Sequence, residues 1–265
     1  MPKLFLLILV LFAIGWGCYE EQEGCLDPMA TNYDVSADIN ANCQYPSFSF
    51  SVDHRWGDDL FSMDSFYTDA AGNSFQILFF GLFVRDIEVD TGMGWVLLNA
   101  SKQEWSLINN ANLEASDPIG FIQARNFENS WGELDYFGVF DSVRMQLGLG
   151  PLEDVDPNLL REDHPLNQNS QMYDTTNQSY YGWVLRYRAD TASGTPIRQV
   201  SSTKGQRISW SQQATGDIMT AENKSFIFEL NYELLFGNFR IDNLPFNNRS
   251  AINENWSTAL ILRES

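Results

Sequence analysis

Positive charge is scarce in this sequence. Its 265 residues hold 16 Lys and Arg against 35 Asp and Glu, a formal net charge of −19. An acidic surface of this kind repels nucleic acid and anionic lipid and attracts cations. The composition therefore argues against a nucleic-acid-binding protein.

Histidine is rarer still: the sequence has only His54 and His164. The sequence contains no HExxH metal motif, no G-x-S-x-G nucleophile pattern and no phosphate-binding P-loop. Its many carboxylates form pairs by chance, so that no acid–base pair stands out. We therefore expect a protein that is not an enzyme.

Long hydrophobic runs are also missing, apart from one at residues 4–14. This run follows a positively charged start, and it is too short to span a bilayer, which needs about 20 apolar residues. It has the pattern of a secretory signal peptide. The glycine before Cys18 resembles the lipobox of bacterial lipoproteins, in which the cysteine is acylated. The resemblance implies a signal peptide at 1–17 and a lipid on Cys18; an ordinary cleaved signal is the alternative.

Cysteine is limited to three residues. If Cys18 carries lipid, Cys25 and Cys43 are left as one pair in a compartment where disulfides persist. Such a bridge is worth about 3 kcal/mol in the chain-entropy model. A two-thiolate metal site is the alternative, but no histidine lies near. We predict an acidic tether at 18–24 and a disulfide-closed module at 25–46.

The module resembles a short segment, GC-x-DP-x-A-x-NYD followed by C-x-Y, that occurs near the ends of many bacterial surface proteins. Oxygen-bearing side chains alternate along it, and this suits Ca²⁺. The calcium hypothesis names Asp34, Asp38 and Asn40 as ligands, whereas the alternative is a polar face on an extended segment. The acidic residues after Cys18 resemble a signal for export to the cell surface, and a solvated linker is the alternative there.

Sustained helical periodicity is rare, whereas alternation of apolar and polar residues recurs from residue 47 onward. We predict an all-β domain at 47–265, an antiparallel β-sandwich or barrel-like domain with long loops. Four loops exceed the length of simple hairpins, and such loops are usually functional or mobile. The expected strands lie within 48–54, 75–83, 141–148, 181–187 and 225–232, and the long loops within 109–120, 154–177, 190–206 and 242–255.

Two of these loops carry apolar residues that no predicted strand buries. Leu159 and Leu160 lie in the loop 154–177, and Phe246 lies in the loop 242–255. We predict that these three side chains contact a partner surface. The alternative is that they fold back onto the domain as a lid.

Several motifs follow one another in the β domain: F-x-F-x-x-DH-x-x-G with its following strand at 48–75, then 80–87, 140–152, 172–184 and 234–255. Their order resembles the methanobactin-associated periplasmic (MbnP-like) family. Members are secreted β-proteins, often lipoproteins, and some bind copper through histidine and a tryptophan-derived ligand. The resemblance carries over only His54 as a copper ligand, because Asp174 stands where the family has tryptophan and 209–212 lacks histidine. Copper needs several soft or imidazole ligands, so we expect this site to be degraded.

Aromatic residues make up 14% of the chain and invite a comparison with sugar-binding sandwiches, which stack sugars on exposed rings. Burial in the core is the alternative. The platform candidates are Trp56, Trp95, Trp105, Trp131, Trp183 and Trp256.

The leading expectation for the whole protein is a lipid-anchored accessory protein of the outer membrane, on its periplasmic or its surface side, that binds an outer-membrane protein or surface complex. Copper capture and carbohydrate binding are the alternatives. Copper and calcium are the cofactors considered.

Overall fold

In the computed structural model the chain forms two compact units, and the boundary between them along the sequence lies between Tyr45 and Pro46. Cys18 and the expected signal peptide lie outside the described residues. None of the helices described is long and apolar enough to cross a membrane. The structure describes residues 20–98, 105–106, 112–113, 119–125, 128–134, 136–150, 156–160, 162, 165–189, 194–219 and 221–264.

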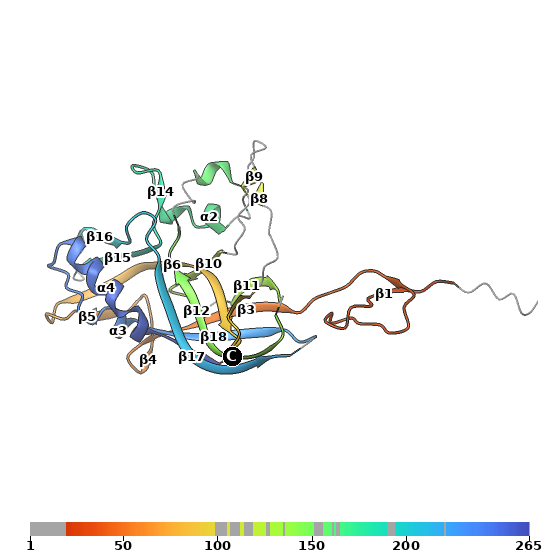
Figure 1. Cartoon of the computed structure of the whole chain (residues 1–265). Coiled ribbons are helices and arrows are strands. Elements are labelled where there is room, and N and C mark those ends of the chain that lie inside the picture. Colours follow the sequence, from red (N-terminus) through yellow and green to blue (C-terminus); the bar gives the residue numbers. More distant parts are fainter. Residues whose placement is uncertain are drawn as a thin grey trace, which may run out of the picture. The chain divides into compact units, whose positions relative to one another are not determined.

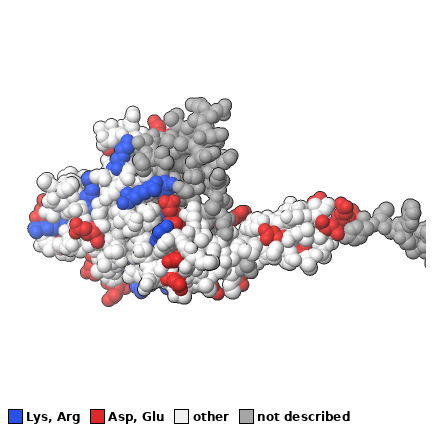
Figure 2. Space-filling model, viewed as in Figure 1, with Lys and Arg blue, Asp and Glu red and all other residues white. Residues whose placement is uncertain are grey.

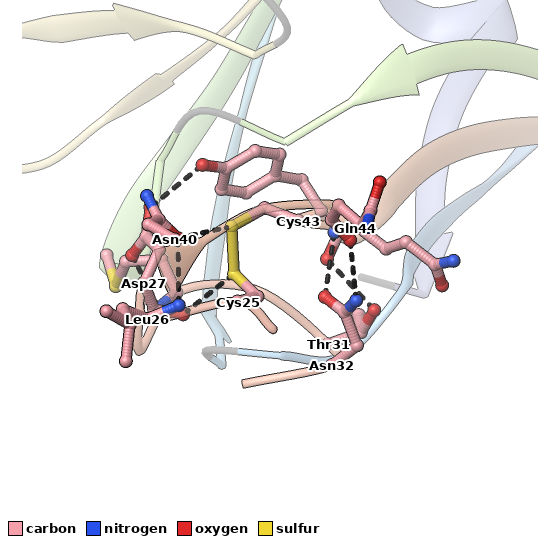
Figure 3. Close-up of a disulfide and its surroundings, with 11 residues drawn as sticks. Cys25, Leu26, Asp27, Thr31, Asn32, Asn40, Cys43 and Gln44 are labelled. Atoms are coloured by element: carbon pink, nitrogen blue, oxygen red, sulfur yellow. Dashed lines mark hydrogen bonds between the residues drawn. A yellow bond between two sulfur atoms is a disulfide. The ribbon is translucent and has the colours of Figure 1, made fainter. Parts of the chain in front are cut away.

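The N-terminal unit is a small module closed by the predicted disulfide between Cys25 and Cys43 (Figure 3). Strand β1 (Glu23–Gly24) pairs in parallel with β2 (Ile39–Asn40). A Cβ added at Gly24 would lie 2.9 Å from the Ala37 Cβ, so the close approach of the two segments requires glycine here.

The second unit holds two β-sheets (Figure 1). The first sheet is antiparallel and has the order β16 (Ile197–Ser201), β15 (Trp183–Ala189), β6 (Ser74–Asp90), β12 (Gly138–Leu147) and β17 (Ile208–Ile218), with β5 (Phe66–Thr68), β7 (Trp95–Leu97) and β10 (Ile119–Gln123) also paired to β6. The second has the order β11 (Glu128–Glu133), β3 (Ser47–Trp56), β18 (Lys224–Asn231) and β19 (Leu260–Glu264), with β4 (Asp59–Leu60) beside β3. Strands β3 and β18 run parallel. Two short hairpins, β8 (Trp105–Ser106) with β9 (Asn112–Leu113) and β13 (Tyr173–Asp174) with β14 (Ser179–Tyr180), complete the strands.

The inner faces of the two sheets meet in one aromatic core. The ring of Trp210 on β17 lies 5.6 Å from that of Phe228 on β18. Phe140 on β12 and Phe226 on β18 are 5.8 Å apart. Strands such as β3 and β18 supply alternate residues to this core, which is why alternating segments of the sequence indicated them. The all-β prediction is confirmed, and in the described chain the arrangement is a sandwich with no closed barrel.

The middle of strand β6, from Phe79 to Arg85, is buried on both faces, which explains the continuous apolar run in its sequence. Its outer face meets a second core beneath the segment 156–181. That segment contains η1 (Pro157–Leu159), α2 (Pro165–Gln168), η2 (Ser170–Met172) and the β13–β14 hairpin. The second core consists of Phe79, Phe83, Phe121, Leu149, Leu160, Leu166, Met172, Tyr180 and Val184.

The prediction of a loop at 242–255 is wrong, because most of this segment belongs to a helix, α4 (Pro245–Ala259). The short helix α3 (Tyr232–Leu235) packs beside it. Four buried residues of α4 fall at helical spacing and form its inner face: Asn248, Ile252, Trp256 and Ala259. One of them is an asparagine, so the apolar period was incomplete in the sequence.

Candidate functional site

The oxygens proposed as calcium ligands take part in the local structure of the module. The Asp34 carboxylate accepts hydrogen bonds from the Ser36 backbone at 2.9 Å and hydroxyl at 2.6 Å, which lowers its pKa. Asp38 accepts from the Gln22 backbone at 3.0 Å. Asn40 accepts from the Leu26 backbone at 2.9 Å (Figure 3). The Asp34 contacts cap a turn, and those of Asp38 and Asn40 join segments that are distant in the sequence. Calcium binding by the three residues stays a prediction.

The other motif residues of the module also have structural roles. The Tyr45 hydroxyl donates to Asp27 at 2.9 Å. The Asn32 side chain accepts from the Gln44 backbone at 2.8 Å and donates to the carbonyl of Asn42 at 2.7 Å. The module therefore holds its shape through the disulfide and polar contacts, rather than through an apolar core.

His54 lies inside the β domain, on β3, with only 4% of its surface exposed. Its Nδ1 atom lies 2.9 Å from the Tyr232 hydroxyl, and the two rings stack. Burial lowers its pKa to about 4, although a hydrogen bond to the backbone of Arg125 acts in the opposite direction. The ring is therefore neutral near pH 7. In the described part of the chain no three His, Cys, Asp or Glu residues gather to hold a metal ion. The resemblance names His54 as a copper ligand, and the expectation that this copper site is degraded stays a prediction.

Three of the six tryptophans proposed as a sugar platform are core residues. Trp131, Trp183 and Trp256 are at most 2% exposed, so this proposal is wrong for all three. They face inward because the strands and α4 bury their apolar sides. Trp95 is half-buried, and the Arg144 guanidinium lies 4.2 Å from its ring centre. Of the remaining two, Trp56 stacks on Tyr67 at 3.9 Å, and the side chain of Trp105 lies outside the described residues.

The loop residues proposed to bind a partner have different environments. Leu160 is 1% exposed and belongs to the second core, so for this residue the partner prediction is wrong and the lid alternative holds. Burial against the outer face of β6 accounts for it. The side chain of Leu159 lies outside the described residues. Phe246 is 70% exposed near the start of α4, and its partner role stays a prediction.

A group of exposed apolar side chains gathers at one end of the sandwich. Met93 is 97% exposed, Val139 69% and Met219 54%. Beside them is a surface hollow of about 510 Å³, lined by Thr91, Met93, Gly94, Trp95, Val96, Tyr136, Phe137, Gly138 and Val139. We call Met93, Trp95, Tyr136, Phe137, Val139 and Met219 together the apolar tip.

Strand register places the apolar tip at the end where the chain enters the β domain. Gly138 on β12 pairs with Ile218 on β17, next to Met219. The first residue of β3, Ser47, pairs with Glu133, and the Leu134 backbone donates to the Pro46 carbonyl at 2.8 Å. The tip residues come from three separate turns, so no single sequence segment could have revealed them.

The comparisons with known proteins give one fold-level similarity. No family model and no curated protein matches this chain. A solved structure, MbnP from Methylosinus trichosporium, is similar with a TM-score of 0.47 and 10% sequence identity over 75% of this chain and 80% of that chain. At this identity and TM-score the similarity assigns neither a ligand nor an activity to the chain.

Proposed function

We propose that this chain is a lipid-anchored, non-enzymatic accessory protein of the outer membrane that docks onto another membrane protein through the apolar tip. The exposure of Met93, Val139 and Met219 beside a hollow carries the proposal. Each Å² of apolar surface left exposed to water costs about 25 cal/mol relative to burial. Contiguous patches of this kind mark interaction surfaces.

The position of the tip fits an anchored protein. A lipid on Cys18 would hold the chain by its N-terminal segment, which reaches the β domain at Pro46, on the same end as the tip. A partner in that membrane would then meet the tip at a high effective concentration, so that a modest interface suffices. With a charge of −19 the remaining surface resists nonspecific association.

The anchor is tested by Cys18→Ala. Without an acyl acceptor, the protein is expected to move from the membrane fraction to the soluble fraction, because only the modest contact through the apolar tip would remain to hold it at the membrane. Fractionation and blotting measure the shift. Equal membrane retention of the variant and the parent chain would rule out the acylated cysteine as the anchor.

Docking is tested by Val139→Glu and Met219→Glu, singly and combined. Both side chains are exposed, so the changes should leave the thermal midpoint nearly unaltered while a charge in the interface removes the partner from a crosslinked membrane pull-down. Leu60→Glu is the matched control, because Leu60 is 70% exposed and pairs with Arg55 at the opposite end of β3. A partner recovered equally with all variants would contradict the proposal.

A further inference from the structure

A second surface hollow, of about 360 Å³, lies on the outer face of the first sheet, beside the segment that covers the second core. Two arginines and two glutamines supply its polar side chains, and none of the described residues that line it carries a carboxylate. Its volume is at the lower end of the range that holds small ligands, about 300–1,000 Å³. We call it the arginine groove; its lining is Met63, Leu78, Phe79, Gln123, Arg125, Gln171, Arg186 and Ile197.

Neutral groups hold Arg186 in place. Its Nε atom donates to the Gln199 side chain at 3.0 Å, and an Nη atom donates to the Gln171 carbonyl at 2.8 Å. The guanidinium lies 5.3 Å from the ring centre of Phe79. Arg188, two residues along the same strand face, donates to the Gln76 side chain at 2.6 Å. These contacts fix the positions of the guanidinium groups without neutralising their charge.

Three arginines elsewhere in the described chain, Arg144, Arg240 and Arg263, are paired with acids. Arg144 binds Glu88 at 2.6 Å, and Arg263 binds Glu229 at 2.7 Å. By contrast, the stretch 177–210 has five Lys and Arg and one Asp, in a chain that is acidic as a whole. Figure 2 shows Lys and Arg gathered over the region of β6, β15 and β16. The groove itself holds two guanidinium groups, those of Arg125 and Arg186, and this makes it a locally positive site on an acidic protein.

We propose that the arginine groove binds an acidic saccharide. A guanidinium presents paired N–H donors that match a carboxylate, sulfate or phosphate group. The Gln123 and Gln171 amides can both donate to and accept from sugar hydroxyls. Met63 and Ile197 offer apolar contacts for the C–H face of a sugar ring. An acidic peptide shares the charge but not the ring hydroxyls that the two amides suit, so the saccharide fits the groove better.

Titration calorimetry on the full chain tests the proposal with four probes: polygalacturonate, dextran sulfate, neutral dextran and polyglutamate. We expect binding to at least one acidic polysaccharide and none to dextran. The preferred acidic polysaccharide shows whether the groove takes carboxylate or sulfate. Arg125→Gln with Arg186→Gln should weaken binding at least tenfold. Arg263→Gln, which removes an exposed arginine from the other sheet, should change it less than twofold.

Thermal midpoints of all variants establish that each is folded. Gln171→Met, which leaves the backbone carbonyl and both arginines in place, should also weaken saccharide binding if the amide recognises hydroxyls. The proposal is overturned if the parent chain binds neither acidic polysaccharide, or if the double arginine variant binds as tightly as the parent. Polyglutamate bound as well as the polysaccharides would overturn the saccharide assignment and indicate an acidic peptide ligand.

Discussion

At the scale of single residues, His54 shows how the same side chain can suit two hypotheses. The resemblance to a copper-binding family singles it out as a ligand. The structure places it in the interior, beside Tyr232 and the backbone of Arg125, where its polar atoms already have protein partners. A buried neutral histidine that forms hydrogen bonds with both a neighbouring hydroxyl and a backbone group has a structural role.

This environment predicts the titration of His54. Burial lowers its pKa from 6.5 to about 4. The unfolded chain therefore takes up a proton on His54 at a higher pH than the folded chain. The contribution of His54 to the free energy of unfolding is complete above pH 6.5 and is lost as the pH falls toward 4, by up to about 3 kcal/mol. Histidine NMR signals followed over a range of pH measure the pKa of His54. The variant His54→Gln identifies which resonance belongs to this residue. A His54 signal that titrates near 6.5 would show that the ring is accessible.

At the scale of secondary structure elements, periodicity predicted the five expected strands. It missed β17 and α4, and the expected loop 190–206 is wrong where it contains β16. The segment 48–54 became β3, and the apolar run 75–83 became the middle of β6, because their patterns follow directly from burial of one or both strand faces. On α4 a core position is taken by Asn248, which bonds the Arg240 backbone in both directions, at 3.1 and 2.7 Å. A polar residue satisfied by tertiary contacts cannot be recognised as core from the sequence.

The burial pattern of α4 predicts different effects of two substitutions on that helix. Ile252 is fully buried, and Ile252→Ala should lower the free energy of unfolding by about 2–5 kcal/mol through lost packing and a cavity. Phe246 is 70% exposed, and Phe246→Ala should change it by no more than about 0.5 kcal/mol. Urea denaturation of the two variants checks the difference. Similar losses for both would mean that Phe246 packs against the domain.

At the scale of the whole molecule, the disulfide confines its stabilisation to one unit. The Cys25–Cys43 bridge lies entirely within the N-terminal unit. Cys25→Ser with Cys43→Ser should destabilise the module by about 3 kcal/mol and speed its hydrogen exchange. The thermal midpoint of the β domain should stay constant. A fall of more than about 3 °C, which corresponds to about 1 kcal/mol in a domain of this size, would show that the two units are coupled.

The two proposed binding surfaces also belong to this scale. The apolar tip joins residues from three turns, and the arginine groove joins β6, β10, β15, β16 and η2. Sequence patterns report which face of a strand is buried, but not which turns or strand faces become neighbours. The net charge of −19 describes the whole chain, so it does not indicate that one groove is lined by two arginines.

Site-specific photo-crosslinking in intact cells tests the docking proposal most directly. A photoreactive residue replaces Val139 in the apolar tip or, as the control, Leu60, which is equally exposed at 70% against 69%. We expect the probe at 139 to form a discrete adduct with one membrane protein, and the probe at 60 to form none. If neither position yields an adduct, or if both capture the same protein equally, the apolar tip is not the docking surface.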